Sequence, residues 1–452
     1  MKDSACTKAA ASRVFAAALL LGVACGSPAA RADATADELS QLKQQLEQSR
    51  RVIQQLSDKV DKLEAQVQSQ QQAAAVPPAQ QEQGEIKQLQ QEIKDLAGGM
   101  SRRSLAEGLP MHGFIDVGAA SSNQGQPKGF DIGRLDFYLT PDLGPRVKGL
   151  VELNFEVGSG APTVGTDLER MQLGYVFSDE FTAWMGRFHT PYGYWNTAFH
   201  HGAQIQTSIL RPGFLDFEDS GGILASHMVG LWGTGKFNVG PGKLAYDGYV
   251  GNGSRIIYGS SAMPGAVPLG GQLDMNLYSD DNHSLAFGGA LAYLFSGDLD
   301  GLRLGVHGYY MGVDAYDQNN NPVAKSQVGM YGGYGAYIAD PWEIMAEFYR
   351  FDDENVLGGS GTHQSWAGFF QIARTYLGQW TPYLRGERAS LSQQDVYFIA
   401  QQAGGSYSRG AAGLRYDLTP STALKLELER TLETDRLRQE FSQARFQFAT
   451  RF

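Results

Sequence analysis

The sequence offers two patterns that could bind a metal ion. His200 and His201 are adjacent, and neighbouring residues converge on one ion only where the backbone is irregular. No third ligand at a metal-site spacing accompanies them. A second segment, with Asp314, Asp317 and asparagines at 319–321, resembles a calcium loop but lacks the glycine and the final glutamate of that pattern. We therefore expect no metal site and no cofactor.

Catalytic patterns are also missing from the sequence. There is no G-x-S-x-G motif and no spaced Ser/His pair that stands out. The Gly-Gly pairs at 221–222 and 288–289 are not followed by the lysine of a phosphate-binding loop. Without a nucleophile, a base and a group to orient them, we expect that the chain is not an enzyme.

Charged residues instead alternate with apolar residues, as in Arg134-Leu135-Asp136-Phe137. A period of two predicts strands with one polar and one apolar face. A transmembrane β-barrel needs such strands, because one face meets lipid and the other meets the lumen. Charges without partners cannot be buried dry, so this lumen would contain water. We expect the following residues to line the pore: Arg134, Asp136, Glu152, Asn154, Glu156, Arg170, Arg187, Arg415, Lys425, Glu427, Glu429, Arg445 and Arg451.

Composition agrees with a barrel and excludes other classes. The chain has 56 glycines in 452 residues, about 12 %, against an average of about 7 %. Beyond the N-terminus no apolar run approaches the ~18 residues of a membrane-spanning helix. A closed barrel is the only other way to satisfy backbone polar groups in lipid. The net charge of −11 argues against nucleic acid as a partner.

The chain ends on an aromatic residue of an alternating segment. Phe446, Phe448 and Phe452 fall on one face, and Arg445 and Arg451 fall on the other. An ordinary amphipathic edge strand would explain the alternation but not the terminal aromatic residue. The pattern resembles the C-terminal sorting signal of bacterial outer-membrane proteins, which implies that the barrel-assembly machinery reads the last strand at Phe452.

Residues 1–32 have the pattern of a signal peptide. A basic start precedes an apolar stretch, and Ala30-Arg31-Ala32 forms an A-x-A cleavage site. Cys6 and Cys25 both lie in this segment, so cleavage after Ala32 leaves a mature chain without a thiol. The alternative is a lipoprotein signal modified at Cys25. Gly22 stands where a leucine is usual in such signals.

Residues 33–72 show the heptad spacing of an α-helical coiled coil. Apolar residues recur in steps of three and four from Leu39 to Val67. Residues 73–109 then form a linker, which contains Pro77-Pro78, and a short second helix. The alternative is a single solvated helix or a disordered spacer. A coiled coil here would lie in the periplasm and contact peptidoglycan or a periplasmic partner.

From residue 110 to residue 452 the turn signals predict an antiparallel barrel of about 16 strands. Seven short turns, rich in Gly, Pro, Asn and Asp, alternate with eight longer loops, which we place at 121–129, 158–166, 189–223, 252–283, 313–325, 353–363, 392–406 and 433–440. Residues Gln272 to Tyr278 also have strand character. We assign them to the fourth loop, because another wall strand would break the alternation of turns and loops.

This organisation resembles the bacterial outer-membrane porin superfamily, and most closely the phosphate-selective porin O and P family. The residues that carry the resemblance are His112-Gly113-Phe114-Ile115-Asp116, Arg134-Leu135-Asp136-Phe137, Gly186-Arg187-Phe188, Thr190-Pro191-Tyr192-Gly193 and Phe452. The resemblance implies a homotrimer in the outer membrane, with the third loop folded inward to narrow the pore. It also implies inward Lys and Arg that select anions, whereas acidic residues outnumber basic ones in this barrel.

The third loop, 189–223, is the longest between strands and is rich in aromatic residues. Loops of this length are usually functional or disordered, and we expect this one to be ordered inside the lumen. Its constriction residues would be His200, His201, Arg211, Asp216, Glu218 and Asp219, facing wall arginines such as Arg187. The alternative is an outward-facing surface loop.

The sequence therefore predicts a water-filled porin for passive diffusion of small polar or ionic solutes, with weak selectivity. Two alternatives remain open. The barrel could be an anchor whose coiled coil tethers the cell envelope. It could also be a substrate-specific channel for a sugar, an organic acid or phosphate, which the aromatic third loop would suit.

Overall fold

A computed structural model describes residues 111–123, 129–157, 164–200, 202–218, 222–257, 270–274, 284–317, 319, 321–435 and 439–452. The predicted signal peptide 1–32, coiled coil 33–72 and linker 73–109 lie outside these residues, as do His201 and Asp219. Within the described residues, no helix is both long enough and apolar enough to cross a membrane.

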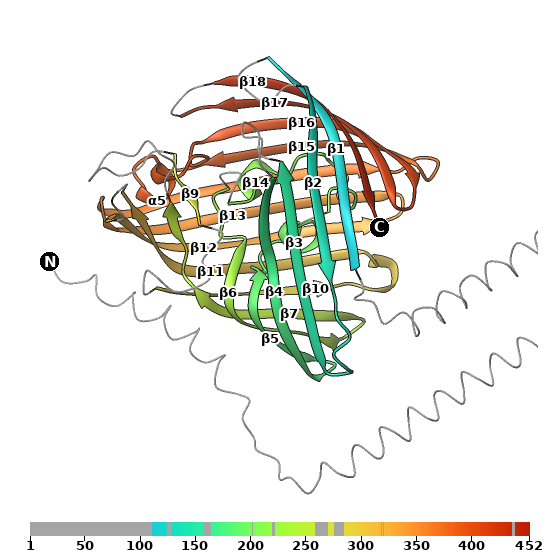
Figure 1. The fold of residues 1–452 in the computed structure, drawn as a ribbon, viewed down its shortest axis with the longest axis horizontal. Coiled ribbons are helices and arrows are strands. Elements are labelled where there is room, and N and C mark those ends of the chain that lie inside the picture. Colours follow the sequence, from blue (N-terminus) through green and yellow to red (C-terminus); the bar gives the residue numbers. More distant parts are fainter. Residues whose placement is uncertain are drawn as a thin grey trace, which may run out of the picture. The chain divides into compact units, whose positions relative to one another are not determined.

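Sixteen strands of the described residues form one closed antiparallel barrel (Figure 1). They are β1 Met111–Ser122, β2 Gly129–Leu139, β3 Val147–Val157, β4 Val164–Ser178, β5 Phe181–His189, β6 His227–Val239, β7 Gly242–Asn252, β10 Leu285–Leu294, β11 Leu302–Tyr316, β12 Pro322–Ala339, β13 Trp342–Leu357, β14 Gly361–Arg374, β15 Trp380–Ser390, β16 Tyr407–Thr419, β17 Thr422–Glu433 and β18 Glu440–Arg451.

Two further strands, β8 Arg255–Ile257 and β9 Gln272–Leu273, lie between β7 and β10 along the chain. They pair with each other, and β7 pairs directly with β10. β8 and β9 are therefore not strands of the barrel wall. This arrangement confirms the expected count of sixteen strands, with the segment around Gln272 left in the fourth loop.

The barrel closes where its first and last strands meet. β18 pairs antiparallel with β1 in a register that places Phe446 opposite Ala119. Gly113 and Phe452 exchange both backbone hydrogen bonds, each at 3.0 Å. Because every wall strand has two neighbours, the sheet has no free edge. The closed barrel predicted from the sequence is confirmed.

The fifth loop is shorter than the predicted 313–325. The β11–β12 ladder continues through Val313–Ser326 and Asp314–Lys325 before it ends. Lys325 Nζ lies 3.2 Å from a carboxylate oxygen of Asp314. Opposite charges directly across two strands stabilise the pairing, which explains why the strands extend beyond the apolar alternation. Asp314, which the calcium-loop pattern included, therefore pairs with a lysine.

Apolar side chains cover the outer face of the wall. Leu173, Met185, Leu384 and Leu428 are each more than half exposed, whereas their neighbours Gln172, Arg385 and Glu429 are buried. This alternation is the pattern of a wall with lipid outside and polar groups inside. The polar face predicted from sequence is therefore the inner face of the barrel.

The contact between Gly113 and Phe452 predicts a site where barrel closure is sensitive to size. A Cβ at position 113 would lie 2.3 Å from the Phe452 ring and 2.6 Å from the Asp136 carbonyl oxygen, so Gly113→Ala forces a shift at the closing strands. We expect the free energy of unfolding to fall by ~1–3 kcal/mol, which would appear as a lower unfolding temperature on heat-modifiability gels.

Gly248→Ala is the matched control, because nothing lies within 4 Å of a Cβ at that strand position. This variant should unfold within a degree or two of the wild type, in line with the ~0.5 kcal/mol of neutral substitutions. Equal unfolding temperatures for the two variants would contradict the packing of Phe452 at the closure.

Candidate functional site

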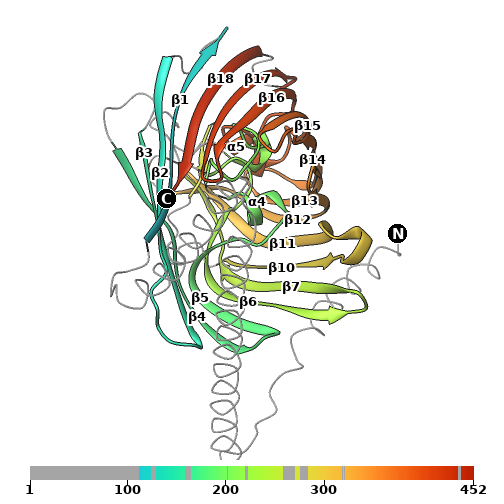
Figure 2. The same cartoon turned by 90° about the vertical axis from the view of Figure 1, so that its right-hand side faces the viewer.

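The third loop joins β5 to β6 and lies inside the ring of strands (Figure 2). It contains a short helix, α4 Trp195–Ala198, and a 3-10 turn, η2 Gly213–Leu215. Aromatic residues hold these turns in place. Trp195 packs edge-on against Phe369 of β14 at 5.6 Å between ring centroids, and Phe214 packs against Tyr349 of β13 at 5.2 Å. Burial of such side chains stabilises a loop that has little secondary structure.

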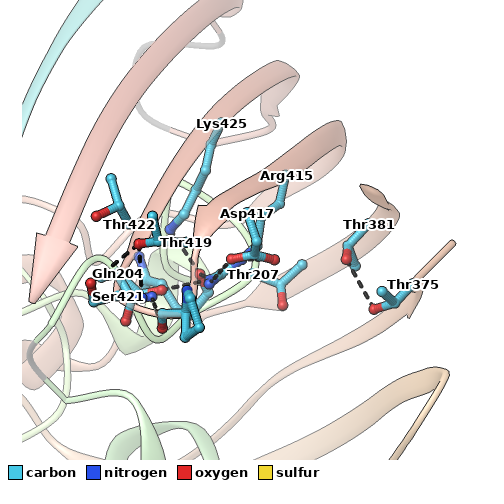
Figure 3. Close-up of polar contacts among 12 residues, drawn as sticks. Gln204, Thr207, Thr375, Thr381, Arg415, Asp417, Thr419, Ser421, Thr422 and Lys425 are labelled. Carbon is cyan, nitrogen blue, oxygen red and sulfur yellow. Dashed lines mark hydrogen bonds and ion pairs between the residues drawn. The ribbon is translucent and has the colours of Figure 1, made fainter. Parts of the chain in front are cut away.

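Cations of the wall bind the backbone of the loop. Lys425 of β17 donates to the carbonyl oxygens of Ala203, Gln206 at 2.7 Å and Ser208 at 3.1 Å. Arg415 of β16 donates to the carbonyls of Gln204 at 2.6 Å and Gln206 at 3.0 Å (Figure 3). Irregular backbone has no internal partners for its carbonyls, so donors on the wall replace water there.

Arg385 of β15 completes this set. Its guanidinium donates to the carbonyl of Leu210 at 2.7 Å, to the carbonyl of Arg211 at 3.3 Å and to the hydroxyl of Ser208 at 2.9 Å. We call Arg385, Arg415 and Lys425 the wall cations. The side chain of Arg385 is fully buried, as is Lys425, and a buried charge is tolerated only with such partners.

Carboxylates of the wall bind the amide groups of the same loop. Glu427 of β17 accepts from the N–H groups of Ile209 at 3.0 Å and Leu210 at 3.3 Å. Further pairs join Gly213 N–H to Glu387 at 2.6 Å, Trp195 N–H to Glu347 at 2.5 Å, and the Thr207 hydroxyl to Glu343 at 2.7 Å. Hydrogen bonds to an ionised group are about twice as strong as neutral ones. The loop is therefore bound to β13, β15, β16 and β17 through both of its backbone polar groups.

The predicted wall residues outside this contact bind other groups of the wall. The ion pairs are Arg134 with Glu156 at 2.9 Å, Arg170 with Glu152, and Arg409 with Glu429 at 3.7 Å. Asn154 donates to Asp136 at 2.6 Å, and Arg445 donates to the side chain of Gln443 at 3.0 Å. Arg187 donates to the backbone carbonyl of Glu169 at 2.9 Å. Arg451 lies exposed beside the short turn before β17, where it donates to the carbonyl of Pro420. Positive and negative groups are thus mixed along the wall.

The predicted constriction residues are held within the loop and at its ends. Arg211 donates to the carbonyl of His200 at 2.8 Å and stacks on the Phe217 ring at 3.7 Å. Burial lowers the pKa of Arg211 to about 10, so it keeps its charge at neutral pH. Glu218 binds His227, and Asp216 is half-buried at the end of η2.

These contacts differ from the expected eyelet of opposed side chains. The wall cations bind carbonyl oxygens of the loop and not its acidic side chains. Arg187 likewise binds a backbone carbonyl of β4. The physical reason is that an irregular loop brings many carbonyls into the lumen, and each needs a donor.

Several residues of this site were missed by the sequence interpretation. Arg385 and Glu387 follow the same alternation as Lys425 and Glu427, since Leu384 faces outward between its neighbours. Glu343 and Glu347 of β13 are an even number of positions apart and therefore lie on the same face of that strand. The period of two could have found all four, but Pro382 and Gly386 obscured the pattern around Arg385.

The seventh loop also packs against the third, which the sequence did not predict. It contains α5 Val396–Ala400, and the hydroxyl of Tyr397 donates to the carbonyl of Ile223 at 2.5 Å. Phe398 packs edge-on against Phe351 of β13 at 5.2 Å. Gly271 of the fourth loop donates to the carbonyl of Ala400 at 2.7 Å. The third, fourth and seventh loops are therefore in contact, with the seventh loop between the other two.

Comparison with solved structures identifies the architecture. A loop L8 deletion mutant of OmpT, an outer membrane protein of Vibrio cholerae, matches with a TM-score of 0.50 at 10 % identity, over 76 % of this chain and 99 % of that chain. The chain has the fold of an outer-membrane β-barrel. An anion-selective porin from Comamonas acidovorans gives 0.49 at 13 % identity, over 76 % and 99 % of the two chains. The outer membrane channel DcaP of Acinetobacter baumannii gives 0.46 at 11 %, over 76 % and 97 %.

No family model and no curated protein matches the sequence. The closeness to the phosphate-selective porin O and P family therefore stays a prediction. At about a tenth identity the structural similarity shows the fold of the barrel, and the function has to be argued from its residues.

The wall cations give a prediction about the third loop. Lys425→Met removes the donor to three carbonyls. We expect this change to weaken the binding of the loop to the wall by ~2–4 kcal/mol. The amides of Ile209 and Leu210 should then exchange hydrogen at least tenfold faster than in the wild type, measured by hydrogen–deuterium exchange.

Lys243→Met is the control, since Lys243 is an exposed lysine at the start of β7. It should leave the exchange of these amides unchanged. If Lys425→Met also left it unchanged, the attachment of the loop would not depend on this lysine.

Proposed function

We propose that this protein is an outer-membrane porin, a water-filled channel for passive diffusion of small polar or ionic solutes, and not an enzyme. One observation carries the proposal. The third loop is bound to one side of the lumen, whereas three charged inner-face residues on the other side are partly exposed to water.

The exposed fractions of the inner-face side chains show this asymmetry. On β15 and β17 the wall cations Arg385 and Lys425 are fully buried against the loop. On β2, β3 and β4 the side chains of Arg134, Glu156 and Arg170 are 24 %, 36 % and 24 % exposed, whereas Asp136, Glu152 and Asn154 are buried. Arg134 faces the loop across this side, with its guanidinium 4.7 Å from the Phe217 ring. The solute path that we propose passes the exposed side chains of Arg134, Glu156 and Arg170.

The charges along this path support weak selectivity. Arg134 and Arg170 are each paired with a glutamate, so neither sign dominates. The wall cations, which would be needed for a series of anion sites, are already bound to backbone carbonyls. Phosphate selectivity, which the family resemblance implies, finds no support in this arrangement.

The remaining parts of the proposal concern assembly. The signal peptide 1–32 would be removed on export, and the barrel-assembly machinery would read the strand that ends at Phe452. The barrel would form a homotrimer in the lipid bilayer of the outer membrane. The coiled coil would extend into the periplasm, where contact with peptidoglycan is the basis of the alternative function as a tether.

The proposed path can be mapped with single cysteines, because cleavage after Ala32 leaves no native thiol. In Arg134→Cys the new side chain lies on the water-filled side. A charged methanethiosulfonate reagent added during a planar-bilayer recording should change the single-channel current in steps, since the added group enters the path of the ions.

Ser365→Cys is the matched control, because Ser365 is a buried inner-face residue of β14 and differs from cysteine by one atom. The reagent should leave its current unchanged. A response at Ser365 with none at Arg134 would contradict the proposed path, because the ions would then pass on the β14 side of the loop.

The mixed charges predict the ion preference directly. In a KCl gradient the zero-current potential should lie closer to zero than to the ideal value for either ion, because arginines and glutamates are paired along the path. A potential close to the ideal anion value would contradict weak selectivity while leaving the channel itself intact.

A further inference from the structure

Four side chains from separate parts of the chain converge at the base of the third loop. They are Glu169 of β4, His189 at the end of β5, His200 of the loop and His227 at the start of β6. One ligand atom from each lies within 4.8 Å of all the others. Sequence reasoning considered His200 only with its neighbour His201. The fold instead brings His200 beside two histidines that are partners across the β5–β6 ladder.

The closest contacts join three atoms that can each act as a ligand. His200 Nε2 lies 3.0 Å from His227 Nε2, and His227 Nε2 lies 2.6 Å from Glu169 Oε2. The side chains of His227 and Glu169 are 1 % and 4 % exposed. Imidazole nitrogens and a carboxylate oxygen in a dry site form the donor set that zinc prefers.

A second layer of residues orients both imidazoles. Glu218 lies 3.0 Å from His227 Nδ1, on the side of the ring away from the cluster. A carboxylate there accepts a hydrogen bond from Nδ1–H, so Nε2 is the nitrogen that would exchange its proton for the ion. Carboxylate–histidine pairs of this kind are typical of metal-bound histidines.

His200 is oriented in the same way by an amide. Its Nδ1 lies 2.9 Å from Asn196 Oδ1. The orientation of this amide is fixed, because Asn196 Nδ2 donates to the carbonyl of Thr190 at 2.9 Å and Arg211 donates to Oδ1 at 3.3 Å. His200 Nδ1 is therefore the donor, and Nε2 is the atom left to bind an ion.

We propose that Glu169, His200 and His227 bind a divalent transition-metal ion of the zinc class inside the barrel. A tetrahedral zinc ion with bonds of about 2.0–2.1 Å separates its ligand atoms by roughly 3.3 Å. The ligand atoms already lie 2.6 to 3.0 Å apart along the cluster, so small side-chain movements suffice.

His189 supplies the fourth ligand after a change in its ring orientation. Its ring stacks on His200 at 3.3 Å between centroids, with an angle of 15° between the planes. Lone pairs lie in the ring plane, so two parallel rings cannot both point at one ion. Rotation of His189 out of the stack directs a nitrogen at the site. The bound ion would then join the loop to β4, β5 and β6, opposite the wall cations.

The test measures zinc binding to untagged, full-length mature protein in detergent, stripped with a chelator and dialysed against zinc. The wild type should retain about one zinc per chain. The double variant His200→Gln, His227→Gln should retain none, and a variant of a histidine outside the cluster, His363→Gln, should bind like the wild type. Heat-modifiability gels show that each variant has folded.

Two further variants separate a built site from chance binding. Glu218→Gln and Asn196→Ala keep all four ligands but alter their orientation, and such changes typically lower metal affinity 10–100-fold. Cobalt in place of zinc should give the absorption bands of a tetrahedral site in the wild type and not in the double variant. Zinc retention that is equal in the wild type and the double variant, or absent from both, would overturn the proposal. The four side chains would then be held together by hydrogen bonds and not by an ion.

Discussion

The arrangement of this barrel depends on the mutual satisfaction of buried wall charges and loop backbone. A third loop with little secondary structure brings carbonyl and amide groups into the lumen, and each is costly to bury without a partner. Lys425, Arg385 and Arg415 supply donors for the carbonyls, and Glu427 and Glu387 supply acceptors for the amides. These wall charges are buried for the same reason, because the loop gives them the partners that water would otherwise provide.

The position that we propose for the solute path follows from this interaction. The loop is bound to the β13–β17 side, and Arg134, Glu156 and Arg170 on β2–β4 are partly exposed to water. The cations that would attract anions are engaged by carbonyl oxygens, so the open side carries paired charges. In the proposed function, the binding of the loop and the weak selectivity both follow from one contact. The histidine cluster lies at the opposite attachment of the loop, where His200 meets β4 and β6.

The strand count, the closure and the inner face could be predicted because each has a local signal. Alternation places Lys425 and Glu427 on one face, and the turn residues fix the number of strands. The partners of these residues could not be predicted, because Glu427 binds Ile209 across 218 positions of sequence and through a backbone group that carries no side-chain signal. The histidine cluster was missed for a related reason: His189 and His227 become neighbours only through the β5–β6 register.

Single-channel recording tests the central claim most directly. Purified full-length protein, added to a planar lipid bilayer in symmetric salt, should produce stepwise current increases of uniform size, because an open side of the lumen connects the two solutions. The current should persist without any bound substrate. Correctly folded barrels that insert into the bilayer and carry no current would contradict the account, since the third loop would then close the lumen on both sides.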